Sequence, residues 1–413
     1  MSSQRSQSEQ PEQIASSEPV RPRADSDGFV LTGPLSYAPT SRPNARGHLP
    51  FSFGAEFEMI LRPKDGLVPD ANASVKDFRN FNLALLKQIA KLLSNAGMPA
   101  FAFDCSDDTK PDYSKWNVML DGSLSKKHMC DGFCKQTIIP TLAIMTPVEI
   151  VIVPVEIVTP IIQANAGWVA LIDHFWSTLN QNYEYRRDHS CGFHVHISPV
   201  TQSYNVEQIR QLAKAIIFWE RATAECAPPS RQDEVLGFCK SNLLVRVPIA
   251  TSLDTHSFWR GHQAAFEYID KVGKDEVIDY ICPDKYRAWN ILPSKIDGAG
   301  SIEFRRAPGV VNAKQAKHWI AFTMAFIELG MQFHPDDFAR YVRSNPLLQD
   351  LTFADFESKL LVCAKELNIY AQLDPRLRQP DNPRTLHITN MDSASLAWLQ
   401  RLDKDYQYSS RSA

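Results

Sequence analysis

Three short strand-like segments constrain the fold of this 413-residue chain most, because each carries two ionisable residues two positions apart. The pairs are Glu56 and Glu58, His194 and His196, and Glu303 and Arg305. Side chains at positions i and i+2 of a strand point to the same face of a sheet. We therefore expect one polar sheet face that carries carboxylate, imidazole and guanidinium groups. Together these groups indicate divalent metal ions and a phosphate-bearing ligand.

The composition limits the classes of protein to which this chain can belong. With 44% hydrophobic residues, the chain can bury a sizeable core. The formal net charge of −3, from 44 basic and 47 acidic residues, gives no field that would draw the whole molecule to nucleic acid or to an anionic membrane. The eight cysteines are scattered and only Cys130 and Cys134 lie close together, so we expect reduced thiols in a cytoplasmic protein.

The amino-terminal segment and one apolar stretch differ from the rest of the chain. Residues 1–45 are rich in Ser, Gln, Glu, Pro and Arg, which predicts a disordered tail without a secretory signal. Residues 137–162 are apolar enough to resemble a membrane span. They also contain Glu149, Glu156 and four prolines, and their β-branched residues favour strands. We expect buried strands there, not a membrane helix.

Amphipathic periodicity predicts several helices between the strand-like runs. The predicted helices are Asp77–Ala96 (closed by Gly97), Val206–Glu225, Ala313–Phe333, Phe338–Arg343 and Phe353–Leu367. The alternation predicts an α+β fold, in which helices cover one face of a sheet and the charged residues occupy the other. We expect residues 336–405 to form a C-terminal helical extension and residues 406–413 to form a flexible tail.

Each charged pair, taken alone, also has a purely structural explanation. Two glutamates two apart can lie on the wet face of a sheet, two histidines can be hydrogen-bonded, and Glu303 with Arg305 can form a same-face ion pair. Known His-x-His sites fit poorly. A cupin would place a glutamate shortly after His196, a deubiquitinase-type metalloprotease would place an acid where Val206 stands, and an amidohydrolase would carry the pair on its first barrel strand.

One arrangement does fit in order and spacing. Glu56-Phe-Glu58 is followed by Trp116-Asn-Val118, Asp121-Gly-Ser-Leu124, Glu156-Ile-Val-Thr-Pro160, Gly192-Phe-His-Val-His196, Arg287 with Asn290, and Ile302-Glu-Phe-Arg305. Over roughly residues 50 to 335 this series resembles the amidoligase family, which is similar to glutamate–cysteine ligase and glutamine synthetase. The resemblance implies an open antiparallel β-sheet funnel of the glutamine synthetase-like type, with helices on its outer face, in a catalytic domain of residues 46–335.

The resemblance also implies an activity and roles for individual residues. The activity is ATP-dependent amide formation through an acyl phosphate, with Mg²⁺ or Mn²⁺. One ion would be held by Glu56, His194 and Glu303, and a second by Glu58, Glu156 and Asp121. Arg305 would lie against the transferred phosphoryl group. Catalytic roles would fall to Arg305, Glu303 and Arg287, and nucleotide contacts to Arg305, Arg287, Asn290 and His196.

Several alternatives stay open at the level of sequence. Glu149 and Glu156 lie seven residues apart, so on one unbroken strand they face opposite ways and only one faces the metals. We choose Glu156 because the Val-Thr-Pro after it matches the pattern of the family that the chain resembles. Parity cannot choose between His194 and His196; we favour His194. Residues 125–147 are either a lid or an inert insertion. A catalytically inactive scaffold, a metal-dependent hydrolase and a phosphotransferase acting on guanidino groups remain alternatives, and neither the carboxylate and amine substrates nor the oligomeric state can be deduced.

Overall fold

The structure is a computed structural model whose described residues all lie in the unit Tyr37–Ala413. The described residues are 51–64, 78–103, 111–120, 153–164, 167–186, 190–200, 203–228, 231, 239–243, 255–333 and 353–377. The predicted tails 1–45 and 406–413, the segment 125–147 and the predicted helix Phe338–Arg343 lie outside them.

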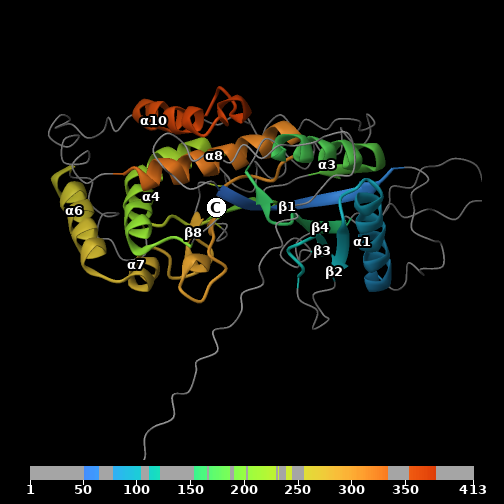
Figure 1. Ribbon diagram of the computed structural model, residues 1–413, viewed down its shortest axis with the longest axis horizontal. Coiled ribbons are helices and arrows are strands. Elements are labelled where there is room, and N and C mark those ends of the chain that lie inside the picture. Colours follow the sequence, from blue (N-terminus) through green and yellow to red (C-terminus); the bar gives the residue numbers. More distant parts are fainter. Residues whose placement is uncertain are drawn as a thin grey trace, which may run out of the picture. The chain divides into compact units, whose positions relative to one another are not determined.

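One sheet of nine strands organises the described residues (Figure 1). The strands are β1 (Phe51–Pro63), β2 (Ala100–Phe103), β3 (Trp116–Leu120), β4 (Val153–Val158), β5 (Ile162–Gln163), β6 (Tyr183–Arg186), β7 (Phe193–Pro199), β8 (Trp289–Asn290) and β9 (Ile302–Phe304). Their order is β2-β3-β4-β1-β7-β9-β8, and β5 and β6 also pair with β1. Every pairing is antiparallel except that of β2 with β3.

Helices complete a mixed α+β fold. They are α1 (Phe78–Asn95), α3 (Trp168–Asn182), α4 (Val206–Cys226), α6 (Thr255–Lys271), α7 (Lys274–Ile281), α8 (Ala313–Met331) and α10 (Phe353–Glu366), with the short 3₁₀ turns η3 (Leu292–Ser294) and η5 (Tyr370–Gln372). The structure confirms, to within a few residues at each end, the predicted helices that correspond to α1, α4, α8 and α10. It also confirms an α+β fold with a large, mostly antiparallel open sheet.

Helix α1 ends just before Gly97, as the sequence predicts. Gly97 has φ of 81°, a conformation that costs glycine little because it has no Cβ. This conformation lets the Gly97 N–H donate to the Ser94 carbonyl at 3.0 Å and the Met98 N–H donate to the Leu93 carbonyl at 2.9 Å. The helix therefore ends with its last carbonyls satisfied, and the chain turns directly into β2.

Alternation along β1 separates an apolar face from a polar face. Phe53, Ala55 and Phe57 are buried, whereas Glu56 and Glu58 are partly exposed. The Phe57 ring lies 4.8 Å from the ring of Phe175 in α3, as measured between centroids. Toward the β8 edge of the sheet, helix α8 packs on the apolar residues of β8 and β9. Ring contacts there join Trp289 to Phe326 and Phe304 to Phe322.

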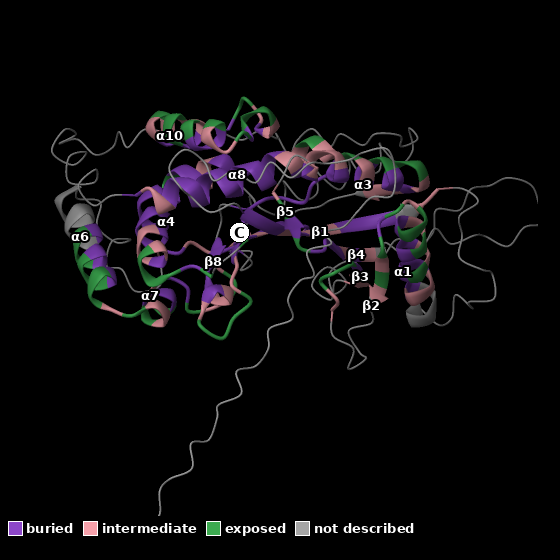
Figure 2. Cartoon of the chain, in the orientation of Figure 1, coloured by how far each residue is buried: buried purple, intermediate pink, exposed green. Residues whose placement is uncertain are grey.

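Helices α3 and α8 cover the apolar face of the sheet, α4 packs against α8, and α10 packs on the outer side of α8 (Figures 1 and 2). Helix α8 contacts β1 and β7 on one side and α10 on the other, so nearly all of its residues are buried. This sandwiched position explains why its sequence is apolar around most of its circumference. The polar face of the sheet remains for the functional side chains.

Buried His318 in α8 ties the end of the described chain to the helix layer. Its Nδ1 accepts a hydrogen bond from the backbone N–H of Asp374 at 3.0 Å, and its side chain is almost fully buried. Burial lowers the pKa of His318 to about 4, because the interior disfavours the charged imidazolium. The ring is therefore neutral in the folded protein at physiological pH.

We predict that this histidine makes stability fall as the pH drops from about 6.5, the pKa of an unfolded histidine, to about 4. In that window the unfolded chain binds a proton that the folded chain refuses, and the loss approaches about 3 kcal/mol. Above the window both states are neutral, and below it both are protonated. Denaturant unfolding across this pH range should show a shallower dependence for His318→Asn, whose amide oxygen can still accept the Asp374 N–H. An unchanged dependence would contradict the prediction.

Candidate functional site

The register of the sheet brings predicted site residues together on its polar face. Directly opposed across neighbouring strands are Glu56 and His194, His196 and Glu303, Glu58 and Glu156, and Asn290 and Glu303. These pairs come from five strands, β4, β1, β7, β9 and β8. Residues up to about 250 positions apart in the chain thus meet because antiparallel pairing aligns them.

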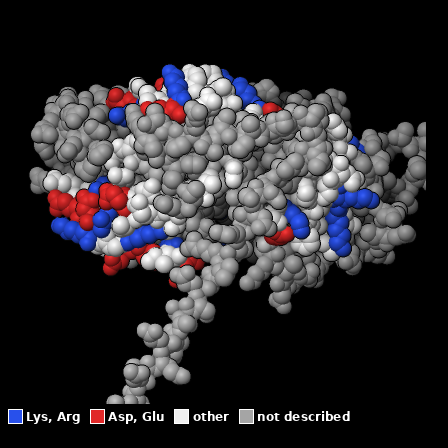
Figure 3. Space-filling view, in the orientation of Figure 1, with Lys and Arg blue, Asp and Glu red and all other residues white. Residues whose placement is uncertain are grey.

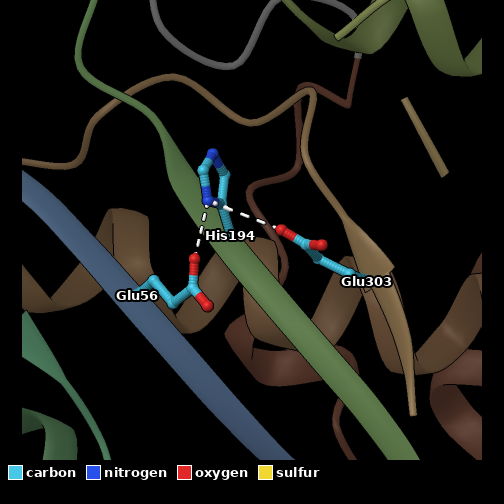
Figure 4. Close-up of side chains that lie close together, drawn as sticks. All are labelled: Glu56, His194 and Glu303. Atoms are coloured by element: carbon cyan, nitrogen blue, oxygen red, sulfur yellow. Dashed lines mark hydrogen bonds and ion pairs between the residues drawn. The ribbon is translucent and has the colours of Figure 1, made fainter. Parts of the chain in front are cut away.

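Glu56, His194 and Glu303 form the centre of this site (Figure 4). One ligand atom of each lies within 4.8 Å of the others. The Nδ1 atom of His194 is 2.8 Å from Oε2 of Glu56 and 3.5 Å from Oε1 of Glu303. His194 and Glu303 are almost fully buried, and Glu56 is about one-fifth exposed. These are the three residues predicted to share the first metal ion.

His196 lies two residues after His194 on β7, and its side chain joins the same cluster. Its Nε2 lies 3.0 Å from Oε1 of Glu56 and 3.8 Å from Oε1 of Glu303. Its Nδ1 lies 3.3 Å from the hydroxyl of Ser301. Each oxygen of the Glu56 carboxylate therefore faces one of the two histidines.

The close carboxylates and imidazoles shift each other's protonation. Burial lowers the pKa of His196, but the negative charges of Glu303 and Glu56 outweigh it and raise this pKa to about 9. Burial raises the pKa of Glu56, but the charge of His196 and the hydrogen bonds of both histidines hold it well below its usual range. The carboxylate at the centre of the site is therefore ionised at neutral pH.

Asn290 and Arg305 hold the Glu303 carboxylate from two sides. The Asn290 Nδ2 donates to Oε2 of Glu303 at 2.7 Å, while its Oδ1 accepts the backbone N–H of Leu292, which fixes the orientation of the amide. The Arg305 Nη1 donates to Oε1 of Glu303. Arg305 is mostly buried, and its backbone N–H donates to the carbonyl of Ala288 at 2.8 Å. The structure thus places Asn290 and Arg305 beside the predicted metal ligand.

Arg287 is held by a different set of groups. Its Nη2 donates to Oδ2 of Asp284 at 2.8 Å, and its Nη1 donates to the carbonyl of Ser241 at 3.0 Å. These contacts tie the start of β8 to residues 239–243. The predicted contact of Arg287 with phosphate or carboxylate stays a prediction.

The predicted second ion site is only partly described. Glu58 and Glu156 lie opposite each other on β1 and β4, whereas Asp121 and the alternative Glu149 lie outside the described residues. Burial and the charges of Glu56 and Glu156 raise the pKa of Tyr113. The amide of Asn117 accepts the Asp112 N–H and donates to the Asp112 carbonyl, which fixes the loop that presents Tyr113.

Two residues at the back of the site were not assigned from the sequence. Gly192 precedes β7, and the position that its Cβ would take lies 2.6 Å from Nη2 of Arg231, 2.7 Å from Nε2 of His194 and 3.0 Å from Oε2 of Glu58. Arg231 is almost fully buried and donates from Nη2 to the carbonyl of Arg305 at 2.8 Å. Gly192 belongs to the Gly192-Phe-His-Val-His196 motif, but nothing in the sequence around Arg231 singled it out.

We predict that Gly192→Ala destabilises the protein by about 1–3 kcal/mol, because the added methyl group overpacks the back of the site. It must displace Arg231 or His194, so metal binding should weaken as well. Denaturant unfolding and a Mn²⁺ titration would measure the two effects. Gly54→Ala is the matched control on β1, since its Cβ would meet only ordinary contacts at 3.9 Å and beyond. Equal behaviour of the two variants would contradict the prediction.

Charges on the surface are mixed. Figure 3 shows Lys and Arg side chains beside Asp and Glu side chains on the face in view. Near α7, for example, Lys295 pairs with Asp279 at 2.6 Å. Such exposed pairs contribute little to stability, about 0–1 kcal/mol each. Among the helices that the structure describes, none combines the length and the apolar character needed to cross a membrane.

An α+β fold whose polar sheet face carries a buried carboxylate–imidazole–carboxylate cluster beside an arginine defines a protein with a metal-capable, enzyme-type site. A family model described as "Putative amidoligase enzyme" matches residues 50–327, and the chain belongs to this family. The match confirms the family resemblance found in the sequence and indicates a ligase-type enzyme. A search of curated proteins found no match.

Proposed function

We propose that this protein is an ATP-dependent carboxylate–amine ligase. In the proposed reaction a substrate carboxylate oxygen attacks the γ-phosphorus of ATP, the bond to the bridging oxygen breaks, and ADP leaves. An amine nitrogen then attacks the acyl carbon, phosphate departs with the bonding electrons, and the nitrogen loses a proton to give the amide. The observation that carries the proposal is the Glu56–His194–Glu303 cluster next to Arg305 in a chain of the amidoligase family.

The donor set fits a divalent cation such as Mg²⁺ or Mn²⁺. Both ions accept carboxylate oxygens, and one imidazole among carboxylates excludes neither of them. Oε2 of Glu56, Nδ1 of His194 and Oε1 of Glu303 would hold the ion. When bound, such an ion neutralises charge on the nucleotide phosphates. When no cation is bound, the positive charges of His196 and Arg305 offset the negative charges of the Glu56 and Glu303 carboxylates.

Arg305 would stabilise the phosphoryl group during its transfer. Its guanidinium is mostly buried, and such a site strengthens its interaction with developing negative charge. The Glu303 carboxylate aims the guanidinium, and the backbone contacts to Ala288 and Arg231 hold its position. A planar guanidinium can also donate two parallel hydrogen bonds to one phosphoryl group.

The remaining assignments belong to the same proposal. We propose that the open sheet forms a glutamine synthetase-like funnel in which the polar face lines the interior. Glu156 and Asp121 would face the acceptor carboxylate across a second ion, and His196, Asn290 and Arg287 would face the nucleotide. The convergence of Glu156, His196 and Asn290 on one sheet face, from distant parts of the sequence, supports this arrangement.

Calorimetric titration with a non-hydrolysable ATP analogue, with and without Mg²⁺, tests the proposal. We expect Mg²⁺-dependent binding to the wild-type protein and its loss in Glu56→Ala. Nucleotide binding that persists in the variant would show that the cluster is not part of the nucleotide site. Absence of binding to the wild-type protein would overturn the ligase assignment in favour of a scaffold protein or a metal-dependent hydrolase.

A further inference from the structure

The carboxylate of Glu58 faces the imidazole of His194 from the side opposite Glu56. We propose that Glu58 is a positioning residue, which accepts the Nε2 proton of His194 while Nδ1 binds the metal ion, and that it is not a ligand of a second ion. The inference rests on the metal site of the proposed function and refines the role that the family resemblance implies for Glu58.

The two nitrogens of the His194 ring face different carboxylates. Nδ1 faces Oε2 of Glu56 at 2.8 Å and Oε1 of Glu303 at 3.5 Å, and these are the atoms of the metal-capable cluster. Nε2 points the other way and lies 3.5 Å from Oε1 of Glu58. An imidazole that coordinates a cation through Nδ1 must carry its proton on Nε2. The group that faces this proton is Glu58.

The second oxygen of Glu58 is also engaged by the protein. Oε2 accepts a hydrogen bond from the backbone N–H of Gly192, and the Glu58 N–H donates to the Gly192 carbonyl at 3.2 Å. The side chain is only about one-tenth exposed. Glu58 is thus fixed to Gly192 through both its backbone and its side chain; Oε2 faces the Gly192 N–H and Oε1 faces Nε2 of His194. This arrangement suits an orienting residue, since carboxylates that accept from a metal-bound histidine fix its tautomer and ring angle.

Arg231 packs at the same glycine as Glu58 and His194. The Cβ position of Gly192 is shared at 3.0 Å or less by Arg231, His194 and Glu58, and Arg231 is almost fully buried. The three side chains therefore converge at Gly192, which leaves no room for a side chain at that position.

Glu58→Gln separates the positioning role from a ligand role. A carboxylate can accept from both the Gly192 N–H and the His194 Nε2–H, whereas a glutamine amide can accept at only one of its two terminal atoms. If Glu58 positions His194, the variant should bind Mn²⁺ about 10–100-fold more weakly at the Glu56–His194–Glu303 site, with an unchanged number of ions. If Glu58 is a ligand of a second ion, one ion should be lost and the affinity of the other should be unchanged, which would overturn the proposal.

Glu184→Gln is the matched control, because Glu184 on β6 lies opposite Arg62 of β1 and therefore on the same sheet face as Glu58. We expect its Mn²⁺ affinity at the Glu56–His194–Glu303 site to equal that of the wild-type protein. An equal weakening in both variants would mean that any lost charge on this face lowers the affinity, and the specific role of Glu58 would fail.

A measurement on the wild-type protein needs no variant of Glu58. Nitrogen-15 NMR of labelled histidines in the Mg²⁺-loaded protein should show His194 protonated at Nε2 and unprotonated at Nδ1, with the assignment made from His194→Gln. The opposite tautomer would overturn the proposal. Both tests use metal alone, so a protein that binds Mg²⁺ but not nucleotide would refute the ligase function and leave the role of Glu58 standing.

Discussion

Replacing Glu303 with glutamine is expected to weaken Mn²⁺ or Mg²⁺ binding by at least about 100-fold and to abolish metal-dependent nucleotide binding. Loss of a group that only orients a ligand costs about 10–100-fold, so loss of a charged ligand should cost at least the upper end of that range. Calorimetric titration with Mn²⁺, followed by the non-hydrolysable ATP analogue, would measure both effects.

The environment of Glu303 explains why a substitution of the same shape should be so damaging. Its Oε1 faces Arg305 and His194, and its Oε2 accepts from Asn290. A glutamine would direct its NH₂ group at one of these donors, so a hydrogen bond would be lost together with the charge. The carboxylate is almost fully buried, which leaves water little room to compensate.

Glu357→Gln in α10 provides a control that removes one carboxylate far from the sheet face in sequence and in fold. It should bind metal and nucleotide as the wild-type protein does. Thermal unfolding of Glu303→Gln would establish that the variant is folded under the titration conditions. A folded Glu303→Gln protein with wild-type metal affinity would exclude Glu303 as a ligand.

The arrangement of the site could be predicted from sequence because strand geometry has a period of two. Parity alone places Glu56 with Glu58, His194 with His196, and Glu303 with Arg305. It cannot tell which strands are neighbours, since pairing depends on contacts between distant segments. The structure supplies this step: β7 lies between β1 and β9, so His194 comes between the two carboxylates.

Parity also could not choose between the two histidines. Both face the polar side. The Nδ1 of His194 lies within the Glu56–His194–Glu303 cluster, and the choice of His194 for the first ion stays a prediction. His196 contacts the same carboxylates at 3.0 and 3.8 Å, so the sequence had no means to separate them. The two histidines differ in where side-chain packing places their rings relative to the Glu56 and Glu303 carboxylates.

Helices could be predicted where their apolar residues recur at helical spacing. The periodicity of α4 matches its burial, with Ile209, Leu212 and Ile216 inside. Helix α3 was not assigned individually, although Trp168, Phe175 and Trp176 pack against the sheet. Arg231 was missed for a related reason: a lone arginine carries no periodic pattern, and only the fold brings it behind Gly192.

Replacing Arg305 with lysine is expected to lower kcat for ATP-dependent amide formation by about 10²–10³-fold, with analogue binding changed by less than about 10-fold. Lysine keeps the positive charge, so the ground-state attraction to phosphate should largely persist. It lacks the planar fork of donors, so it cannot form two parallel hydrogen bonds to the phosphoryl group at the moment of transfer. The loss should therefore appear in kcat and not in binding.

The surroundings of Arg305 make this substitution informative. The Arg305 N–H and carbonyl are held by Ala288 and Arg231, so the backbone should keep its place when the side chain changes. Arg221→Lys is the matched control, because Arg221 is 86% exposed on α4 and should leave kcat unchanged. Steady-state rates with the acid and amine found in a substrate screen would give the comparison. If Arg305→Lys retained the wild-type kcat, the contact between Arg305 and Glu303 would be a structural ion pair only, and charge stabilisation would have to come from the metal site alone.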